Sequence, residues 1–238
     1  MLTQTATHPD AIRRPVMPVR HAAPVPSSLC HEAGENGPLD QSMQLMGASM
    51  FYPRNTEIFG ESEPAEYLYK VVSGSVRTYK ILNDGRRQIG GFYLPGDIFG
   101  LEFAEEHTLS AEAITDAKVL VIKRSALNAL AGRDASIARQ LFTLTARELR
   151  RVQDRILLLV KSAQERVAGF LLEMAERGAG ANCIELPMSR QDIADYLGLT
   201  IETVSRTLTS LETAAAIEVP ASRRIVLRNR TALSRMTG

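Results

Sequence analysis

The chain lacks an uninterrupted apolar stretch of about 18 residues, the length that a membrane-spanning helix requires. Its first residues include basic side chains but no apolar segment of the kind that a secretory signal needs. With 238 residues, the chain is long enough for one or two domains that each bury a core. The sequence therefore predicts a cytoplasmic protein with no membrane partner.

Cysteine is also scarce. The only two, Cys30 and Cys183, lie far apart and show no CxxC or related spacing. This pattern gives no support to a disulfide framework, a structural zinc site or a four-cysteine cluster. The histidines of the first 40 residues, His8, His21 and His31, are too loosely spaced to predict a metal site. No metal is therefore expected.

An excess of positive charge is missing too, since the formal net charge is only +1. Between Ile184 and Gly238, seven arginines stand against six acidic residues, so the arrangement of charge matters more than its balance. Four of these arginines fall between positions 223 and 230, and such a cluster suits contacts with phosphate. The alternative is a solvated hairpin tip.

The first part of the chain changes character near residue 41. Residues 1–40 hold six prolines among Ser, Ala and Gly, which is typical of a flexible arm. Residues 41–132 carry short runs that alternate apolar and polar residues, as half-buried strands do. Turn signals separate the runs at Gly74, Asn83-Asp84-Gly85 and Pro95-Gly96-Asp97. These residues therefore predict a small β-roll or barrel.

Residues 133–161 predict one long helix. Its apolar positions recur at intervals of three and four, which is the heptad spacing of a coiled coil. These positions are Phe142, Thr145, Leu149, Val152, Ile156 and Leu159. A single buried helix would show the same stripe, but Arg147, Arg150 and Arg151 on the other side favour two paired helices. We therefore expect a homodimer that forms through this helix.

Residues 162–238 contain the most informative stretch, SRQDIADYLGLTIETVSRTLTSL at positions 189–211. Ser189 can cap a first helix, and Thr200 can cap a second. Gly198 lies between them, where the backbone must leave the first helix in a conformation that glycine adopts at low cost. Apolar residues at three- and four-residue steps give each helix a buried side. The stretch predicts a helix-turn-helix.

The outward side of the second predicted helix is the part that enters the major groove in a helix-turn-helix. The candidate base-contacting residues on it are Ile201, Glu202, Ser205 and Arg206. An arginine can pair with guanine O6 and N7, and a glutamate can accept a hydrogen bond from a cytosine amino group. The alternative is a helical hairpin in which Glu202 and Arg206 form only a solvated ion pair.

The segment AAIEVPASRRIVLRN predicts two short strands around a turn, which indicates a winged variant of the motif. Phosphate contacts are expected from Ser189, Arg190, Thr200, Thr203, Arg223 and Arg224. Cys183 precedes the motif and is a candidate for redox regulation, whereas an inert thiol is the alternative.

The order of β-roll, long helix and winged helix-turn-helix resembles the CRP/FNR superfamily of bacterial transcription regulators. The resemblance covers residues 50–235, and its most specific motifs are SGSVRTYKILNDGRRQIGGFYLPGDIFG and MSRQDIADYLGLTIETVSR. LPGDIFGLE and YLGLTIETVSRTL look most like the FixK-type branch, which controls low-oxygen respiration, nitrogen-fixation or denitrification genes. The resemblance implies an α+β fold: a cyclic-nucleotide-binding-like β-roll, a dimerisation helix and a DNA-binding domain.

The resemblance also implies an operator. Glu202 and Arg206 match the pair that contacts the shared GA step of family half-sites, and Ser205 matches a serine associated with the leading thymine of TTGA. Ile201 stands where cAMP-responsive members carry an arginine, and it can pack against a thymine methyl group. We therefore expect TTGA…TCAA inverted repeats, bound by a dimer with half-sites about 34 Å apart. An activator of this type recruits RNA polymerase.

Two positions depart from the cAMP-binding members, which hold the cyclic phosphate with an Arg-Ser pair and the ribose with a nearby Gly-Glu. The matching residues here are Leu109-Ser110 and Gly100-Leu101-Glu102. Without the arginine, an anionic phosphate inside the β-roll would be poorly compensated. Cyclic-nucleotide control is therefore not expected.

Other sensing chemistry of the superfamily is equally unsupported. FNR-type oxygen sensors need a cluster of N-terminal cysteines for iron–sulfur ligation, and this half of the chain has only Cys30. His107, the one histidine of the expected β-roll, is interpreted as a satisfied or surface residue rather than a haem ligand. By resemblance, FixK-type proteins can act without an effector, so no cofactor is expected.

Two other classes of function stay open as alternatives. The first is a ligand-gated regulator of the same superfamily, with a small effector inside the β-roll. The second is an enzyme, but the sequence contains no nucleophile–base pair, metal-ligand spacing or phosphate-cradling glycine loop. The serine of SGSVR lacks the strand-to-helix elbow of a hydrolase. We therefore do not expect an enzyme.

Overall fold

The computed structural model describes residues 37–102, 104–158, 160–178 and 182–237. Most of the expected arm, residues 1–36, lies outside this range. A helix, α1 (Pro38–Met46), begins inside the stretch assigned to the arm. Proline suits the first turn of a helix because the amide that it lacks would have no partner there. Leu39 and Met43, one turn apart, are both buried, and this packing holds α1 in place.

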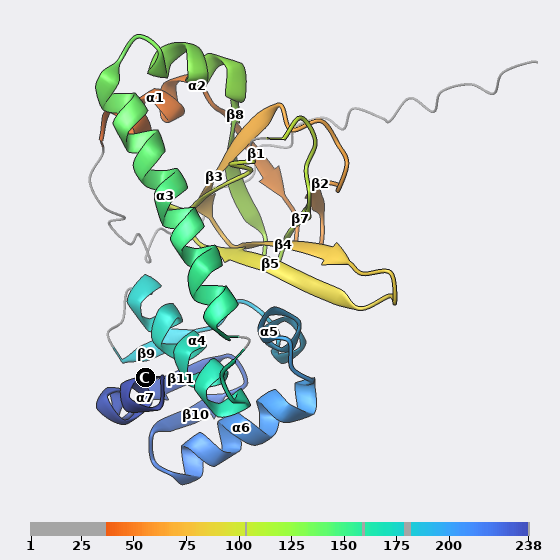
Figure 1. Cartoon of the computed structure of the whole chain (residues 1–238), viewed down its shortest axis with the longest axis vertical. Coiled ribbons are helices and arrows are strands. Elements are labelled where there is room, and N and C mark those ends of the chain that lie inside the picture. Colours follow the sequence, from red (N-terminus) through yellow and green to blue (C-terminus); the bar gives the residue numbers. More distant parts are fainter. Residues whose placement is uncertain (1–36, 103, 159, 179–181, 238) are drawn as a thin grey trace, which may run out of the picture. The chain divides into compact units, whose positions relative to one another are not determined.

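In the part of the chain that the structure describes, the β-roll consists of two antiparallel four-stranded sheets (Figure 1). The first sheet holds, in order, β1 (Ala48–Tyr52), β8 (Ala117–Lys123), β3 (Tyr67–Ser73) and β6 (Ile98–Phe99). The second holds β2 (Glu57–Phe59), β7 (Ser110–Ala113), β4 (Val76–Ile81) and β5 (Arg87–Tyr93). Both sheets contribute to one buried apolar cluster, which includes Val71, Val76, Phe99 and Val119.

The three predicted turns are confirmed. Gly74, Gly85 and Gly96 each adopt a positive φ, at 78°, 82° and 94°. Gly74 joins β3 to β4, where an added Cβ would lie 2.2 Å from the carbonyl oxygen of Asp116. Only glycine fits this turn without a shift of the neighbouring backbone.

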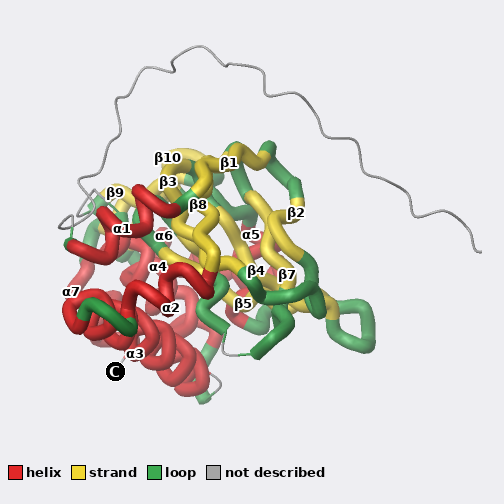
Figure 2. Tube along the Cα trace, turned by 90° about the horizontal axis from the view of Figure 1, so that it is seen from above, coloured by secondary structure: helices red, strands yellow, loops and turns green. Residues whose placement is uncertain are grey.

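Helices α2 (Arg124–Ala131) and α3 (Ala135–Leu158) follow β8. Helices α1 and α2 contact β8, and α3 packs on both helices (Figure 2). The three helices share a second buried cluster, in which Leu127 and Ile137 belong with Leu120 and Ile122 of β8. Asp134 accepts a hydrogen bond from the Ser136 amide at 2.8 Å, close to the predicted start of the long helix. No helix in the described ranges, α3 included, is long and apolar enough to cross a membrane.

The described residues of the C-terminal part form four helices and a three-stranded antiparallel sheet. The helices are α4 (Ala163–Arg177), α5 (Arg190–Leu197), α6 (Ile201–Thr213) and α7 (Arg230–Thr237). The sheet orders β10 (Ile217–Ala221), β11 (Arg224–Leu227) and β9 (Cys183–Glu185). The two predicted wing strands are therefore confirmed, and β9 and α7 are additions to the prediction.

A third apolar cluster joins the β-roll to the C-terminal helices. Ile89 and Phe92 of β5 belong to the same buried group as Phe170 of α4, Ile193 of α5 and Val204 of α6. The helix-turn-helix thus packs directly against a strand of the β-roll.

Candidate DNA-binding interface

Helix α5 begins with a capping box, in which Ser189 is the cap that the sequence predicts. The Asp192 amide donates to Ser189 Oγ at 3.1 Å, and the Ser189 amide donates to Asp192 Oδ2 at 2.9 Å. These bonds satisfy two amides that have no partner within a helix. The helix ends at Gly198, whose φ of 65° and ψ of 40° place it in the left-handed region. Both local predictions are confirmed.

Helix α6 places its polar and apolar residues on opposite sides, as expected. The Thr203 amide donates to Thr200 Oγ1 at 3.2 Å, which confirms Thr200 as the cap. Val204, Leu208 and Leu211 are buried on the inward side. The four candidate base-contacting residues lie on the other side: Ile201, Glu202 and Arg206 are exposed and Ser205 is half-buried.

The carboxylate of Glu202 is an anionic acceptor at neutral pH. Hydrogen bonds from its own backbone amide and from the Thr200 hydroxyl lower its pKa, and the charge of Arg206 contributes least. An exposed carboxylate at the first turn of a helix also lies at the positive end of the helix dipole. Ser205 Oγ accepts a hydrogen bond from Arg190 Nη1 at 3.4 Å, which joins a candidate base contact to a candidate phosphate contact.

The candidate phosphate contacts fall into two groups. Ser189, Arg190, Thr200 and Thr203 lie at the N-terminal ends of α5 and α6, where helix amides favour anions. Arg223 lies in the turn between β10 and β11, and Arg224 begins β11. Arg223 is half-buried and Arg224 is exposed.

Cys183 lies in the wing sheet. Its strand β9 pairs with β11, so Cys183 stands opposite Val226. The side chain is exposed, and Arg224 Nε lies 3.3 Å from its sulfur. From the sequence we expected only that this cysteine precedes the helix-turn-helix. Its place in the wing sheet was not predictable, because β9 pairs with a strand some forty residues later and no local sequence pattern indicates that pairing.

The predicted dimer positions on α3 expose large apolar side chains. Phe142 is 76% exposed, Leu149 58%, Val152 52% and Ile156 59%. Thr145 is half-buried and donates its hydroxyl to the carbonyl oxygen of Leu141 at 3.0 Å, and Leu159 lies outside the described residues. A helix buried within its own chain would cover these side chains, so that interpretation of the stripe is wrong.

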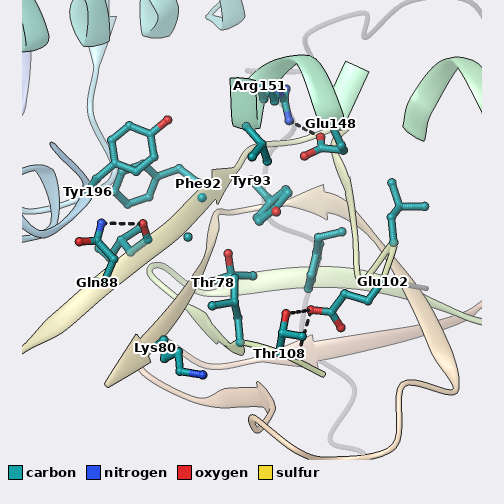
Figure 3. Close-up of a pocket in the computed structure, with 18 of the residues that line it drawn as sticks. Thr78, Lys80, Gln88, Phe92, Tyr93, Glu102, Thr108, Glu148, Arg151 and Tyr196 are labelled. Carbon is teal, nitrogen blue, oxygen red and sulfur yellow. Dashed lines mark hydrogen bonds and ion pairs between the residues drawn. The ribbon is translucent and has the colours of Figure 1, made fainter. Parts of the chain in front are cut away.

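A partly open cavity of about 430 Å³ lies between the β-roll and the helices α3, α4 and α5 (Figure 3). Glu102 lines it but already accepts hydrogen bonds from the Thr108 amide at 3.2 Å and hydroxyl at 3.0 Å. His107 Nδ1 lies 2.5 Å from the other oxygen of Glu102. His107 is buried, not at the surface, and its ring stacks on Phe59 with centroids 3.6 Å apart. Among described residues, its Nε2 has no partner.

Comparison with known proteins gives consistent matches along the chain. Residues 49–134 match the model of the cyclic nucleotide-binding domain, and residues 165–236 match that of the Crp-like helix-turn-helix domain. The nitrogen fixation regulation protein FixK of Azorhizobium caulinodans is 47% identical over 234 residues, covering 93% of this chain and 94% of that protein. FixK of Rhizobium meliloti is 40% identical over 175 residues, covering 73% and 80%.

Among solved structures, FixK2 from Bradyrhizobium japonicum superimposes with a TM-score of 0.78 at 54% identity, covering 81% of this chain and 98% of that one. The fold and the exposed side of α6 define a DNA-binding transcription regulator of the winged helix-turn-helix class. The chain belongs to the CRP/FNR family and, within it, to the FixK branch.

The domain model that matches the β-roll implies a cyclic nucleotide, but the side chains that line the cavity do not fit one. Leu109 stands at the position where cAMP-binding members carry the phosphate-binding arginine. Its side chain packs close to Gly90, since an added Cβ at Gly90 would lie 2.5 Å from Leu109 Cδ1. The cations among the described lining residues already pair with carboxylates: Lys80 with Glu61, Arg151 with Glu148, and Arg177 with Asp97. A cyclic phosphate would find no uncompensated cation among them.

One contact that holds the helix-turn-helix against the β-roll was not predicted from the sequence. Asp192, which completes the capping box of α5, also accepts hydrogen bonds from Arg77 and Arg87 of the β-roll. Arg77 and Asp192 are separated by 115 residues, and no sequence pattern connects them.

Proposed function

We propose that this chain is a homodimeric transcription activator that binds TTGA-N6-TCAA inverted repeats and recruits RNA polymerase. The observation that carries this proposal is the exposed side of α6, on which Ile201, Glu202 and Arg206 lie beside the half-buried Ser205. Its targets are genes of low-oxygen respiration, nitrogen fixation or denitrification, in keeping with relatives named nitrogen fixation regulation proteins. Such a protein acts in the cytoplasm, where chromosomal DNA is found.

Each base-contacting residue has its own role in the half-site. Arg206 pairs with guanine O6 and N7, and Glu202 accepts from the amino group of a cytosine. Ser205 contacts the leading thymine, and Ile201 packs against a thymine methyl group. Phosphate contacts from Ser189, Arg190, Thr200, Thr203, Arg223 and Arg224 fix the register of the protein on the duplex.

The exposed apolar stripe of α3 supports the homodimer. Phe142, Leu149, Val152 and Ile156 have heptad spacing and are more than half exposed in the single chain. Pairing with the same stripe of a second copy would bury them, and Thr145 and Leu159 continue the interface. A two-fold dimer presents two α6 helices to successive major grooves, about 34 Å apart.

A direct binding experiment tests the proposal. Purified full-length protein is titrated onto TTGA-N6-TCAA DNA and onto a scrambled duplex at matched salt, and its mass is measured by sedimentation. We expect a dimer that prefers the palindrome by about a thousandfold or more, the lower end of specific over non-specific binding. A monomer that binds both duplexes equally would overturn the proposal. Run-off transcription with RNA polymerase then tests activation.

The wing supports a second, smaller proposal about Cys183. Because this exposed thiol contacts Arg224, its oxidation would place new polar groups beside a phosphate contact. Hydrogen peroxide takes two electrons from the thiolate, its O–O bond breaks, and sulfenic acid and hydroxide form. Peroxide should then weaken operator binding by the wild type but not by Cys183→Ser, and equal sensitivity of both proteins would contradict this.

A ligand-gated regulator is the second candidate function. The cavity beside the β-roll favours it, as does the buried Thr78 Oγ1 atom, which has no hydrogen-bond partner among the residues that the structure describes. An effector requirement for DNA binding, or a rise in melting temperature with a small ligand, would support this candidate. Full operator binding by ligand-free protein would exclude it.

A further inference from the structure

Asp192 divides its two carboxylate oxygens between two parts of the molecule. Oδ2 belongs to the cap of α5, where it accepts from the Ser189 amide and hydroxyl at 2.9 and 2.8 Å. Oδ1 accepts from Arg77 Nη1 of β4 at 2.8 Å and from Arg87 Nη2 of β5 at 2.6 Å. The carboxylate that begins α5 is therefore also held by two arginines of the β-roll.

A second carboxylate extends this contact along α5. Arg87 Nε donates to Asp195 Oδ2 at 2.8 Å, so one guanidinium spans both aspartates. Beside it, Gln88 Nε2 donates to the Asp195 carbonyl oxygen at 2.8 Å. We call Arg77 and Arg87, together with Asp192 and Asp195, the arginine clamp.

Burial makes the arginine clamp costly to open. Asp192 is 3% exposed and Arg77 9% exposed, so separating them would remove one partner from each of two buried charges, although Arg77 would keep Glu112 and Asp192 would keep Arg87. The surroundings are the cluster that contains Ile89 and Phe92, and the Phe92 ring lies 5.1 Å from that of Tyr196 on α5. A helix cap needs none of these long-range bonds, because the side chain of Ser189 suffices for it.

The arginine clamp also connects the two surfaces that the proposed function uses. Helix α3, which carries the dimer stripe, packs with α1 and α2 on β8 and pairs with the β-roll through Arg151 and Asp97. Helix α5 packs on α6, which carries the base contacts. The clamp is thus a charged link between the part that dimerises and the part that contacts bases, beside a second one in which Asp97 pairs with Arg177 of α4.

We propose that Arg77 and Arg87 are positioning residues for DNA binding, which fix the direction of α6 relative to the dimer stripe and thereby select the spacer length of the inverted repeat. The proposal rests on the proposed function, since only a dimer on a palindrome has a spacer to select. One added base pair rotates a half-site by about a tenth of a helical turn. Rigidly held α6 helices cannot follow that rotation, whereas loosely held ones can.

Arg87→Met tests the proposal, because it removes the bonds to both aspartates and keeps an unbranched apolar stem. Arg86→Met is the matched control: it removes the same charge from the neighbouring residue, which is exposed and pairs with Asp84. Full-length proteins are titrated onto palindromes with spacers of five, six and seven base pairs at matched salt. Wild type and Arg86→Met should bind one spacer more tightly than the others. In Arg87→Met the ratio of these affinities should fall about tenfold, a size that is typical of the coupling between residues of one salt-bridge network.

Two further variants separate positioning from general stability. Arg87→Lys should restore part of the preference, because an ammonium can reach one aspartate but does not span both as a guanidinium does. Asp195→Asn should reduce the spacer preference less in the Arg87→Met background than in the wild type, because Arg87, the partner of Asp195, is already absent from that background. Melting temperatures are recorded for every variant, because a merely structural role would lower them and leave spacer preference unchanged.

The outcomes distinguish this inference from the proposed function. If the wild type prefers one spacer and folded Arg87→Met keeps the same preference, the inference is overturned. If the wild type does not distinguish any palindrome from scrambled DNA, the proposed function fails instead.

Discussion

At the scale of residues, neighbouring side chains on α6 supply opposite hydrogen-bonding chemistry. The pKa of Glu202 is held low by its backbone amide and the Thr200 hydroxyl, so the carboxylate only accepts at neutral pH. Arg206, one turn further on, only donates. An acceptor and a donor at this spacing can discriminate a cytosine from a guanine on adjacent base pairs.

Arg206→Ala should weaken binding to the TTGA palindrome by about 1–3 kcal/mol and relax the preference at one guanine, because it removes a bidentate contact. Ser210→Ala, an exposed position on the same helix, serves as the control and should leave affinity unchanged. Titrations against operators with each base at that position measure the effect. Wild-type affinity in Arg206→Ala would show that another residue contacts the guanine.

At the scale of elements, the helix-turn-helix depends on backbone geometry at a single turn. Gly198 ends α5 with a φ of 65°, and its amide donates to the Ala194 carbonyl oxygen. An added Cβ would meet only Arg166 Nη1, at 3.7 Å. The demand for glycine is therefore conformational and not steric crowding by neighbours.

Gly198→Ala should lower the free energy of unfolding by about 1–2 kcal/mol, the cost of left-handed backbone for a residue with a Cβ. Gly132→Ala is the control, because Gly132 has a φ of −67° and an added Cβ would be 3.6 Å from its nearest neighbours. That change should be neutral or slightly stabilising. Equal denaturation midpoints for the two variants would contradict the argument.

The wing should contribute affinity without sequence preference. Arg223→Ala removes one phosphate contact, so binding should weaken on all sequences and the slope of log K against log salt should decrease by about one. Arg235→Ala, on the exposed side of α7, is the control and should leave the slope unchanged. Titrations on operator and scrambled DNA at several salt concentrations provide the measurement. A loss confined to the operator would assign Arg223 to base recognition.

The elements that were predictable from sequence depend on local contacts. Caps such as Ser189 with Asp192 act within three residues, and heptad spacing on α3 is visible along one helix. Strand β9 and the arginine clamp were not predictable, because they join residues about forty and more than a hundred positions apart. Helix α1 was missed because the proline-rich composition before it hides the spacing of Leu39 and Met43.

At the scale of the whole molecule, the positions of the charged residues matter more than the net charge. The net charge is only +1, yet arginines occupy the wing, the α6 surface and the clamp. The apolar cluster that includes Ile89 and Phe92 joins the β-roll to the C-terminal helices. The large apolar side chains of α3, in contrast, are exposed, and a second copy is the partner that would cover them with matching spacing.

Leu149→Glu should convert the protein to a folded monomer, because Leu149 is 58% exposed in the single chain and its replacement disturbs only the dimer contact. The monomer should lose about a hundredfold or more in operator affinity, since the second half-site no longer binds as an intramolecular event. Thr143→Glu adds the same charge at an exposed position away from the stripe and should remain dimeric. Sedimentation gives the oligomeric state and circular dichroism the fold. A folded, dimeric Leu149→Glu would place the dimer contact elsewhere on the molecule.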